Sequence, residues 1–445
     1  MSFGMHQKPG ATVASMPTLA ERARALSSIE MEWKQRIFSK LLGVLDLSLL
    51  AVVEDAQARV QIREATMRLL VEESAPLSLS QRQLIVKQIE DEVLGHGPLE
   101  PLLADPAVAD ILVNGPNQVY VEKHGKLELT NIRFHDEQHL LNIIDRIVSA
   151  VGRRVDESSP MVDARLKDGS RVNVIIPPLA LDGPMMSIRR FCAEKLSVED
   201  LIRFGTLTEN AATLLRAIVR LRLNVVISGG TGAGKTTLLN VLSGFIPASE
   251  RIVTVEDSAE LQLRQPHVVR LETRPANIEG RGEITQRELV KNSLRMRPDR
   301  IVVGEVRGAE SLDMLQAMNT GHDGSLTTVH ANTPRDALGR IETMVSMTGI
   351  NFPIKALRAQ IASAINIVIQ TSRHEDGRRR ITSIAEVNGM EGEVITMSEI
   401  FTFVRTGVDE SGNVLGVMKP TGMVPSFCKS LASRGIDLPM ATFRP

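Results

Sequence analysis

The chain has 445 residues, 43% of them hydrophobic and 24% charged, which is typical of a globular protein with a large buried core and predicts two or three domains. Its formal net charge of -1 and aromatic content of 3% disfavour DNA or RNA as the main partner, because nucleic-acid proteins usually carry a basic excess and stacking aromatics. The cysteines, Cys192 and Cys428, form neither a disulfide framework nor a zinc site and are expected to be reduced, as in a cytoplasm.

The first 95 residues are expected to be helical after a disordered start. Residues 1–18 are polar and contain Gly and Pro, and they have no apolar core of signal-peptide type. Over residues 19–95 apolar side chains recur at three- and four-residue spacing, which predicts an N-terminal helical bundle with N-caps among Ser78 to Ser80. The most apolar window, residues 40–56, contains two aspartates and is too short to span a bilayer. We therefore expect a soluble chain, or one that is peripheral at a membrane.

Residues 96–192 change in character and predict an α+β domain. Gly and Pro separate short β-branched runs, and one stretch between them has the period of an amphipathic helix. The predicted strands lie at residues 110–115, 118–123, 126–131, 170–180 and 184–191, and the predicted helix at residues 137–152. Residues 193–197 are the expected hinge linker to the last domain.

Residues 198–445 alternate between helical and strand patterns, which predicts an α/β domain with a mainly parallel sheet. A buried strand is expected at residues 220–226 and a helix at residues 238–246, and between them stands ISGGTGAGKTT, which fits G-x-x-x-x-G-K-[ST]. In such a loop backbone N–H groups surround the phosphates of a nucleotide, the lysine reaches the β- and γ-phosphates, and the following hydroxyl binds Mg²⁺. The predicted ATP-binding residues are Gly229, Gly230, Thr231, Gly232, Ala233, Gly234, Lys235, Thr236 and Thr237.

Two acidic segments follow predicted strands. Glu305 ends the apolar run RIVVG, and Glu256, Asp257 and Glu260 follow the run RIVTV. Because sites in parallel sheets form at the carboxyl ends of strands, one carboxylate is expected to position Mg²⁺ and another to orient or deprotonate water. The residues alone do not decide between Glu256 and Glu305 for water activation.

Histidines and arginines complete the predicted site. TGHDGSLTTVHA brings together His322, His330 and two threonines, which suits γ-phosphate sensing, whereas two histidines without cysteines give no support to a zinc site. Arginine matters because negative charge builds on the γ-phosphate during phosphoryl transfer. The α+β domain offers several arginines, most of them expected to be ordinary surface residues: Arg153, Arg154, Arg165, Arg171, Arg189 and Arg190.

Taken together, these segments resemble the secretion and type IV pilus ATPase superfamily and, within it, the Tad (Flp) pilus assembly ATPases of the CpaF kind. The similarity spans about residues 95–400 and includes GGTGAGKTT, VTVEDSAEL, RIVVGEVRG, GHDGSLTTVHANTPRDAL, GSRVNV and SIRRF in one order. The resemblance implies a RecA-like C-terminal ATPase domain preceded by a PAS-like N-domain. It also implies homo-hexameric rings, ATP with Mg²⁺, and inner-membrane platform proteins as partners of a cytoplasmic motor.

The same resemblance implies roles for single residues. VEDSAEL is similar to the family's acidic box, which would make Glu256 the water activator, and RIVVGE to its atypical Walker B, which would place Glu305 with Thr236 on Mg²⁺. The remaining implied roles are γ-phosphate sensing and domain coupling by His322 and His330, and contact of Arg171 and Arg189 with the γ-phosphate when the N-domain closes.

These roles imply a hexameric motor that powers assembly of a Tad or type IV-like pilus or a related secretion machine, with the direction of force left open. Two alternatives stay open as well. A nucleotide-gated scaffold would bind ATP and hardly turn it over, and a RecA-like nucleic-acid motor would be stimulated by DNA or RNA.

Overall fold

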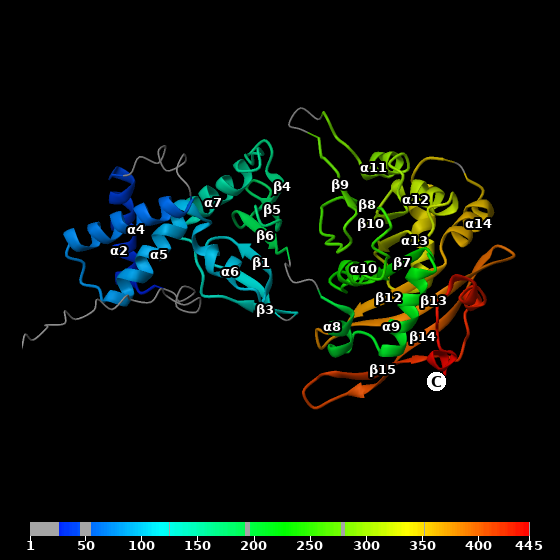
Figure 1. The fold of residues 1–445 in the computed structure, drawn as a ribbon. Helices are drawn as coiled ribbons and strands as arrows, with labels where there is room; N and C mark the ends of the chain where they lie inside the picture. The colour runs from blue at the N-terminus through cyan, green and yellow to red at the C-terminus, as the bar shows by residue number, and fades with distance from the viewer. Residues whose placement is uncertain are drawn as a thin grey trace, which may run out of the picture. The chain divides into compact units, whose positions relative to one another are not determined.

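The computed structural model describes residues 26–44, 55–123, 125–191, 196–276, 281–350 and 352–444. The segment expected to be disordered, residues 1–18, lies outside these ranges, as do Cys192 and residues 193–195 of the expected hinge. The chain divides into two compact units, Met1–Ala193 and Glu194–Pro445 (Figure 1). Each unit has its own hydrophobic cores and is described by itself.

The first part of unit 1 is helical. Helices α2 (Ser28–Val44), α4 (Asp55–Glu72) and α5 (Leu79–Leu94) pack around a shared core that includes Ile37, Ile62 and Ile89. One predicted N-cap is confirmed, because Ser78 Oγ accepts a hydrogen bond from Gln81 N at 3.3 Å and Gln81 Oε1 accepts one from Ser78 N at 2.8 Å. This reciprocal pair satisfies two of the N–H groups that a helix start leaves without partners.

The second part of unit 1 is an antiparallel sheet covered by a helix. Its strand order within the described residues is β3-β2-β1-β6-β5-β4. Alternate residues such as Ile111, Val172 and Ile188 face helix α7, whose Leu140 and other apolar residues share their core. The elements are η1 (Gly97–Leu99), α6 (Glu100–Ala104), β1 (Val108–Asn114), β2 (Val119–Lys123), β3 (Lys126–Leu129), α7 (Glu137–Ser149), β4 (Met161–Arg165), β5 (Arg171–Ile175) and β6 (Met185–Arg189).

Unit 2 is built on one long sheet with the order β15-β14-β13-β12-β7-β11-β10-β8-β9 in the part of the chain described. The pairings from β12 through β9 are parallel, as predicted, whereas β13, β14 and β15 extend the sheet in antiparallel fashion, which the sequence analysis did not predict. The strands are β7 (Val225–Gly229), β8 (Ile252–Glu256), β9 (Val268–Glu272), β10 (Arg300–Val303), β11 (Leu326–Val329), β12 (Ile367–Arg373), β13 (Arg379–Glu391), β14 (Val394–Val408) and β15 (Val414–Pro420).

Helices cover both faces of the parallel part. Val225 and Ile227 of β7 share a core with α9, α10 and the C-terminal turns, while Val226 shares the opposite core with α11 to α14 (Figure 1). Burial on both faces explains why β7 is apolar throughout. The helices are α8 (Val198–Arg203), α9 (Glu209–Arg220), α10 (Lys235–Ser243), α11 (Gln286–Ser293), α12 (Glu310–Asn319), α13 (Pro334–Ser346), α14 (Ile354–Ala364), η2 (Ser426–Ser430), η3 (Ala432–Arg434) and η4 (Met440–Phe443).

Two local predictions need correction. The strand expected at residues 220–226 begins only at Val225, because α9 continues to Arg220 and Arg222 turns the chain with a φ of 61°. The helix expected at residues 238–246 begins three residues earlier, at Lys235. Residues 374–378 form the turn that joins β12 to β13.

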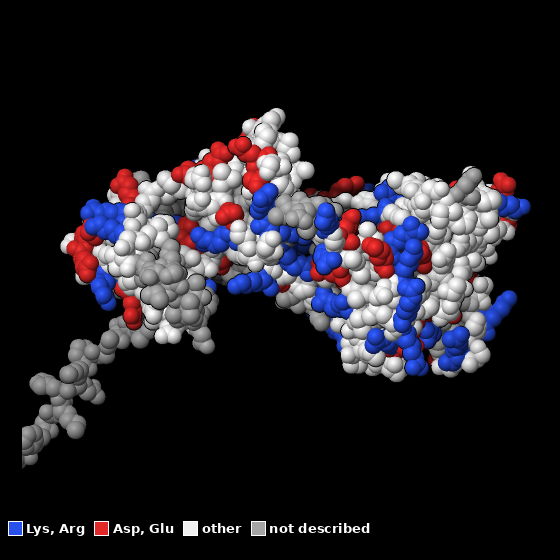
Figure 2. All heavy atoms as spheres, turned by 90° about the horizontal axis from the view of Figure 1, so that it is seen from above, with Lys and Arg blue, Asp and Glu red and all other residues white. Residues whose placement is uncertain are grey.

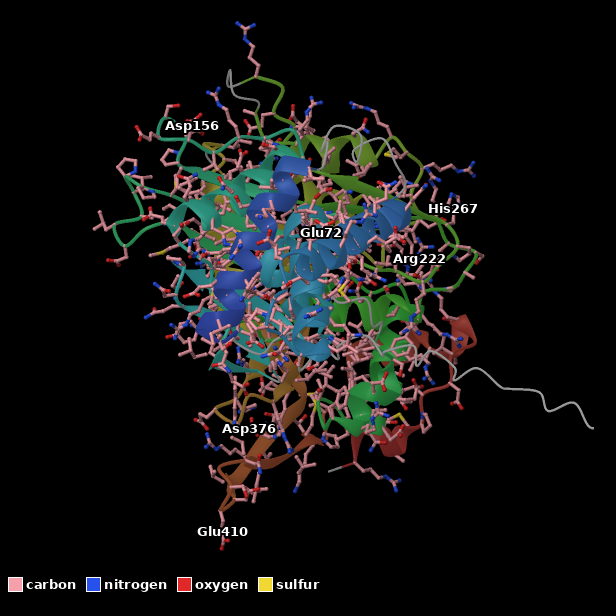
Figure 3. The ribbon with its side chains drawn as sticks, turned by 90° about the vertical axis from the view of Figure 1, so that its left-hand side faces the viewer. Glu72, Asp156, Arg222, His267, Asp376 and Glu410 are labelled. Atoms are coloured by element: carbon pink, nitrogen blue, oxygen red, sulfur yellow. The ribbon has the colours of Figure 1, made fainter. Side chains whose placement is uncertain are left out.

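The surface carries both signs of charge. Figure 2 shows Lys and Arg side chains interspersed with Asp and Glu on the visible face of each unit. Glu410 lies at the tip of the β14–β15 hairpin (Figure 3). None of the helices in the described ranges has both the length and the apolar character that crossing a membrane requires.

Candidate nucleotide-binding site

The glycine-rich loop lies between the end of β7 and the start of α10. Gly232 and Gly234 have φ angles of 68° and 89°, a conformation that residues with a side chain rarely adopt. A Cβ on Gly229 would lie 2.5 Å from Thr371 Oγ1 and 2.6 Å from the Thr371 carbonyl oxygen of neighbouring β12. The glycines are therefore required by the turn itself and by the close approach of β12.

Lys235 curls back over this loop from the first turn of α10. Its Nζ donates hydrogen bonds to the carbonyl oxygens of Gly229 and Gly230, both at 3.1 Å, and lies 3.9 Å from Glu305 Oε1. The charge of Lys235 therefore lies next to the glycine-rich loop, at the N-terminus of helix α10. A lysine and a helix N-terminus together favour the binding of phosphate.

The parallel register brings the carboxyl ends of β7, β11, β10 and β8 to one edge. Glu305 follows β10 at this edge, and its Oε2 accepts hydrogen bonds from Arg307 Nη2 at 2.5 Å and Arg307 Nε at 2.9 Å. Arg307 also reaches Asp257, with 3.5 Å between Nη1 and Oδ2. Arg307 was not among the residues predicted from the sequence, although its place two residues after Glu305 puts it beside the expected carboxylates.

Glu256 is the last residue of β8 and is buried. Its Oε2 accepts hydrogen bonds from Glu260 N at 2.7 Å and Leu261 N at 2.8 Å, while Oε1 has no hydrogen-bond partner among the described residues. Burial raises the pKa of Glu256 to about 7, against the lowering effect of the two N–H donors. A carboxyl group of this kind is poised to exchange a proton near neutral pH.

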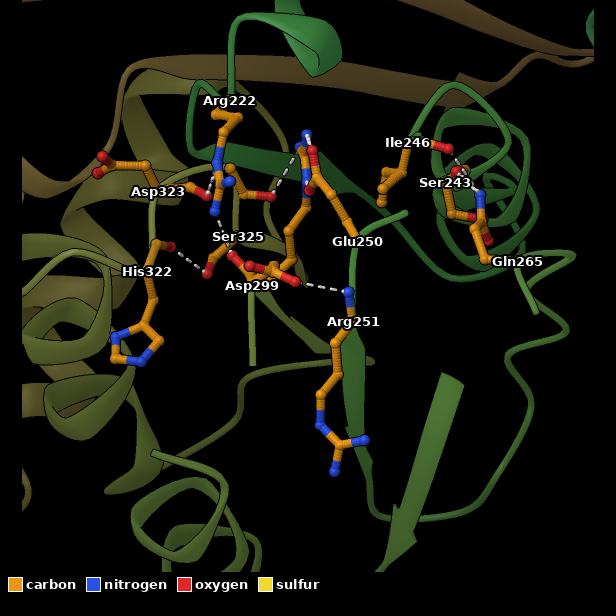
Figure 4. Close-up of polar contacts among 12 residues, drawn as sticks. Arg222, Ser243, Ile246, Glu250, Arg251, Gln265, Asp299, His322, Asp323 and Ser325 are labelled. Carbon is orange, nitrogen blue, oxygen red and sulfur yellow. Dashed lines mark hydrogen bonds and ion pairs between the residues drawn. The ribbon is translucent and has the colours of Figure 1, made fainter. Parts of the chain in front are cut away.

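The structure separates the two predicted histidines. Val329 of β11 pairs with Ser228 of β7, so His330 stands beside the beginning of the glycine-rich loop. His322 precedes β11, whose first residue Leu326 pairs with Val225, and it therefore lies at the opposite, amino-terminal edge of the sheet. There its carbonyl oxygen accepts a hydrogen bond from Ser325 Oγ at 2.8 Å, near Arg222 and Asp299 (Figure 4).

The γ-phosphate role expected for His322 does not agree with this position. His322 precedes strand β11 and His330 follows it, so the two histidines lie at opposite ends of the strand. The sequence already indicated this separation, because the predicted strand lies between them. Of the two histidines, only His330 lies at the edge of the sheet where the nucleotide is expected to bind.

In unit 1 the two predicted arginines are direct neighbours. Arg171 of β5 pairs with Arg189 of β6, Arg165 of β4 pairs with Arg171, and all three lie on the sheet face opposite α7. Arg189 Nε lies 3.5 Å from Asp110 Oδ1 of β1. Arg190 points elsewhere, since its Nη1 donates to the Asp105 carbonyl oxygen at 2.7 Å. The structure thus adds Arg165 to the predicted pair.

The donor set at the loop fits a nucleotide with Mg²⁺. Thr236, in the first turn of α10, and Glu305 are the side chains that would hold the ion. No group of three or more His, Cys, Asp or Glu side chains within the described ranges is arranged to hold a metal by itself. Mg²⁺ at nucleotide sites is usually held by one or two protein ligands together with phosphates and waters.

Comparisons with known proteins identify a family and several relatives. The family model described as "Type II/IV secretion system protein" matches residues 92–396. A protein of Mycobacterium tuberculosis, provisionally named a conjugal transfer protein, is 42% identical over 315 residues, which are 69% of this chain and 89% of the relative. The conjugal transfer protein TrbB of Rhizobium radiobacter is 31% identical over 314 residues, 69% of this chain and 91% of TrbB.

Solved structures of similar sequence are known as well. One of them is the VirB11 ATPase of the Brucella suis type IV secretion system in complex with sulphate, with 28% identity and a TM-score of 0.36, covering 64% of this chain and 91% of that one.

Proposed function

Because the chain belongs to the type II/IV secretion system protein family, we propose that it hydrolyses ATP to ADP and phosphate and uses the reaction as the motor of a secretion or pilus machine. The observation that carries this proposal is the meeting of Lys235 Nζ and Glu305 Oε1, 3.9 Å apart, at the mouth of the glycine-rich loop. A phosphate-binding cation beside a carboxylate that suits Mg²⁺ is a recurring part of sites for phosphoryl transfer.

Each side chain at the loop has a distinct part in this proposal. The loop N–H groups and Lys235 hold the phosphates, and Thr236 with Glu305 would hold Mg²⁺, which neutralises charge that develops on the β- and γ-phosphates. Arg307 orients Glu305 through its paired hydrogen bonds. His330 stands where it can sense the γ-phosphate.

Glu256 is the better candidate for the base that takes a proton from the attacking water. Glu305 Oε2 is already engaged by two hydrogen bonds from the Arg307 guanidinium, and Glu305 is the carboxylate proposed to hold Mg²⁺. Glu256 has a pKa raised to about 7 by burial and one carboxylate oxygen without a protein partner in the described residues. A base whose pKa lies near the working pH transfers protons most effectively.

Arg171 and Arg189, joined by Arg165, are proposed to act on the γ-phosphate when unit 1 closes over the nucleotide. Their direct pairing across β5 and β6 supports this, because like charges held side by side gain from a shared anion. The bound triphosphate would then stabilise the closed form through contacts that the diphosphate lacks, and hydrolysis would release it.

The oligomeric state, location, partners and domain boundaries of the protein are also proposed. We propose a homo-hexamer in the cytoplasm, peripheral at the inner membrane, with platform proteins of a Tad or type IV-like pilus as partners. The proposed domains are residues 19–95, the PAS-like N-domain at 96–192, the hinge at 193–197 and the RecA-like ATPase domain at 198–445. Similarity to conjugal transfer proteins is the main support for a secretion machine of this general kind.

Steady-state ATP turnover by the purified chain tests the proposal. The expected result is phosphate release that Lys235→Ala and Glu305→Gln each abolish, while Glu305→Gln still binds ATP. A chain that binds ATP but does not release phosphate at any concentration would be a scaffold. Turnover that appears only with added DNA or RNA would instead indicate a nucleic-acid motor.

A further inference from the structure

The outer side of the glycine-rich loop is contacted by the β12–β13 hairpin. Arg379 Nε donates a hydrogen bond to the carbonyl oxygen of Gly232 at 2.8 Å. The nearest atom to the position that a Cβ on Gly232 would take is Arg373 Nη1, at 3.3 Å, and the corresponding atom for Gly234 is Arg379 Cδ, also at 3.3 Å. Two arginines from one hairpin therefore pack against both glycines of positive φ.

The hairpin presents these arginines together and is itself firmly held. Arg373 and Arg379 are direct cross-strand partners at the end of the β12–β13 ladder. In the turn between them, Asp376 Oδ2 accepts hydrogen bonds from Arg380 Nη2 at 3.1 Å and from Val414 N of β15 at 3.0 Å. Although burial opposes its charge, these donors lower the pKa of Asp376 to about 2, so the turn stays anchored at any physiological pH.

The hydrogen bond to Gly232 has a consequence for the inside of the loop. A peptide group is planar and trans, so its C=O and the following N–H point in opposite directions. With the Gly232 carbonyl held by Arg379, the N–H of Ala233 points the opposite way, and there it donates a hydrogen bond to the Gly230 carbonyl oxygen within the loop, at 3.4 Å. An N–H in that direction is what a phosphate-binding loop needs.

We infer that Arg379, supported by Arg373, is a positioning residue for the diphosphate portion of the nucleotide, because it fixes the peptide between Gly232 and Ala233 with its N–H turned toward the phosphates. This inference rests on the proposed function and deepens it. Arg379 acts through the loop, which holds the phosphates common to ADP and ATP. Its effect is therefore distinct from that of any group that contacts only the γ-phosphate.

The test compares nucleotide affinity in matched variants of the full chain. Arg379→Met keeps the aliphatic stem and removes the donor, and it is expected to raise the dissociation constants of ADP and ATP by the same factor, about tenfold, as loss of a hydrogen bond from a charged donor implies. The same loss should appear in KM, while kcat at saturating ATP stays within about twofold. Arg379→Lys, which keeps a cationic donor, should recover most of the affinity.

Arg378→Ala is the matched control, because Arg378 is an exposed arginine of the same turn, next to Arg379. It should leave both dissociation constants unchanged, and thermal unfolding of all variants shows whether each is folded. The inference is overturned if folded Arg379→Met binds ADP as the wild type does, or if it loses ATP affinity alone. If Lys235→Ala also binds ADP and ATP normally, the proposed function itself is contradicted. If Lys235→Ala loses nucleotide affinity and Arg379→Met does not, only the role of Arg379 is contradicted.

Discussion

Glu256 at the end of β8 lies directly against the backbone of Gly304, the residue that follows β10. Its Cγ is 3.0 Å from the position that a Cβ on Gly304 would take, which is closer than ordinary van der Waals contact. The Glu256 side chain can therefore occupy this position only because residue 304, immediately before Glu305, is a glycine.

Substitution of that glycine should therefore affect catalysis and leave binding intact. We expect Gly304→Ala to displace Glu256 and lower kcat by about tenfold or more, since small displacements of reacting groups are costly. The dissociation constant of ADP should stay within about twofold, because the glycine-rich loop is untouched. Gly308→Ala is the control, since only the end of the Glu310 side chain approaches that position, at 3.4 Å. Equal kcat values for the two variants would contradict the role given to Glu256.

The raised pKa of Glu256 predicts how stability depends on pH. Because the folded state keeps this proton up to about pH 7 while the unfolded chain loses it near 4.5, the proton contributes stability in full below pH 4.5. That contribution, roughly 3 kcal/mol, is lost as the pH rises through 7. Urea unfolding of the wild type and Glu256→Gln at pH 5 and pH 8 measures it. A wild-type free energy of unfolding that falls no more than that of Glu256→Gln would contradict the prediction.

Substitution of His330 and substitution of His322 should have different effects on kcat for ATP hydrolysis. His330 follows β11 at the phosphate-loop edge and His322 precedes it at the other edge, so His330→Ala should lower kcat for ATP by about tenfold or more, in the range of a lost acid–base or charge-stabilising group. His322→Ala should leave kcat of the isolated chain within about twofold. A larger loss of kcat with His322→Ala than with His330→Ala would place the nucleotide elsewhere.

A buried ion pair at the amino-terminal edge of the sheet should matter for stability. Arg300 is fully buried, donates through Nε to Glu250 Oε2 at 2.5 Å and through Nη1 to the Gly324 carbonyl oxygen at 3.3 Å. Arg300→Leu would leave both acceptors without that donor and is expected to cost about 3–5 kcal/mol of unfolding free energy. The control Arg358→Leu, which breaks a more exposed pair with Glu342, should cost below about 1 kcal/mol. Similar costs for the two variants would show that burial does not set the strength of these pairs.

How far the sequence predicted the structure depended on how local each signal was. The glycine-rich loop, the apolar strands before Glu256 and Glu305, and the capping serine Ser78 were all readable, because each depends on neighbouring residues. Strand β4 was missed because its sequence MVDAR lies at a sheet edge and lacks an apolar alternation. The antiparallel extension β13–β15 was missed because only long-range pairing distinguishes it from parallel strands.

Contacts between residues distant in sequence were also the ones that could not be predicted at the candidate nucleotide-binding site. Arg171 and Arg189 are 18 positions apart, and only antiparallel register shows them to be direct partners with Arg165 beside them. The contact of Arg379 with Gly232 joins residues separated by 147 positions, so neither spacing nor motif could indicate it. The prediction for His322 differs from these cases. The strand between His322 and His330 is long enough to show, from the sequence alone, that the two histidines do not lie at the same edge of the sheet.

The most direct measurement of the central claim is single-turnover ATP hydrolysis by Arg171→Ala/Arg189→Ala, with ATP and ADP affinities measured on the same preparation. The account predicts hydrolysis slowed by about 100-fold or more, as expected when arginines that stabilise transferring phosphate are removed, with ADP affinity within about twofold of the wild type. Hydrolysis at the wild-type rate in that variant would contradict it, because ATP would then be cleaved without the arginines of unit 1.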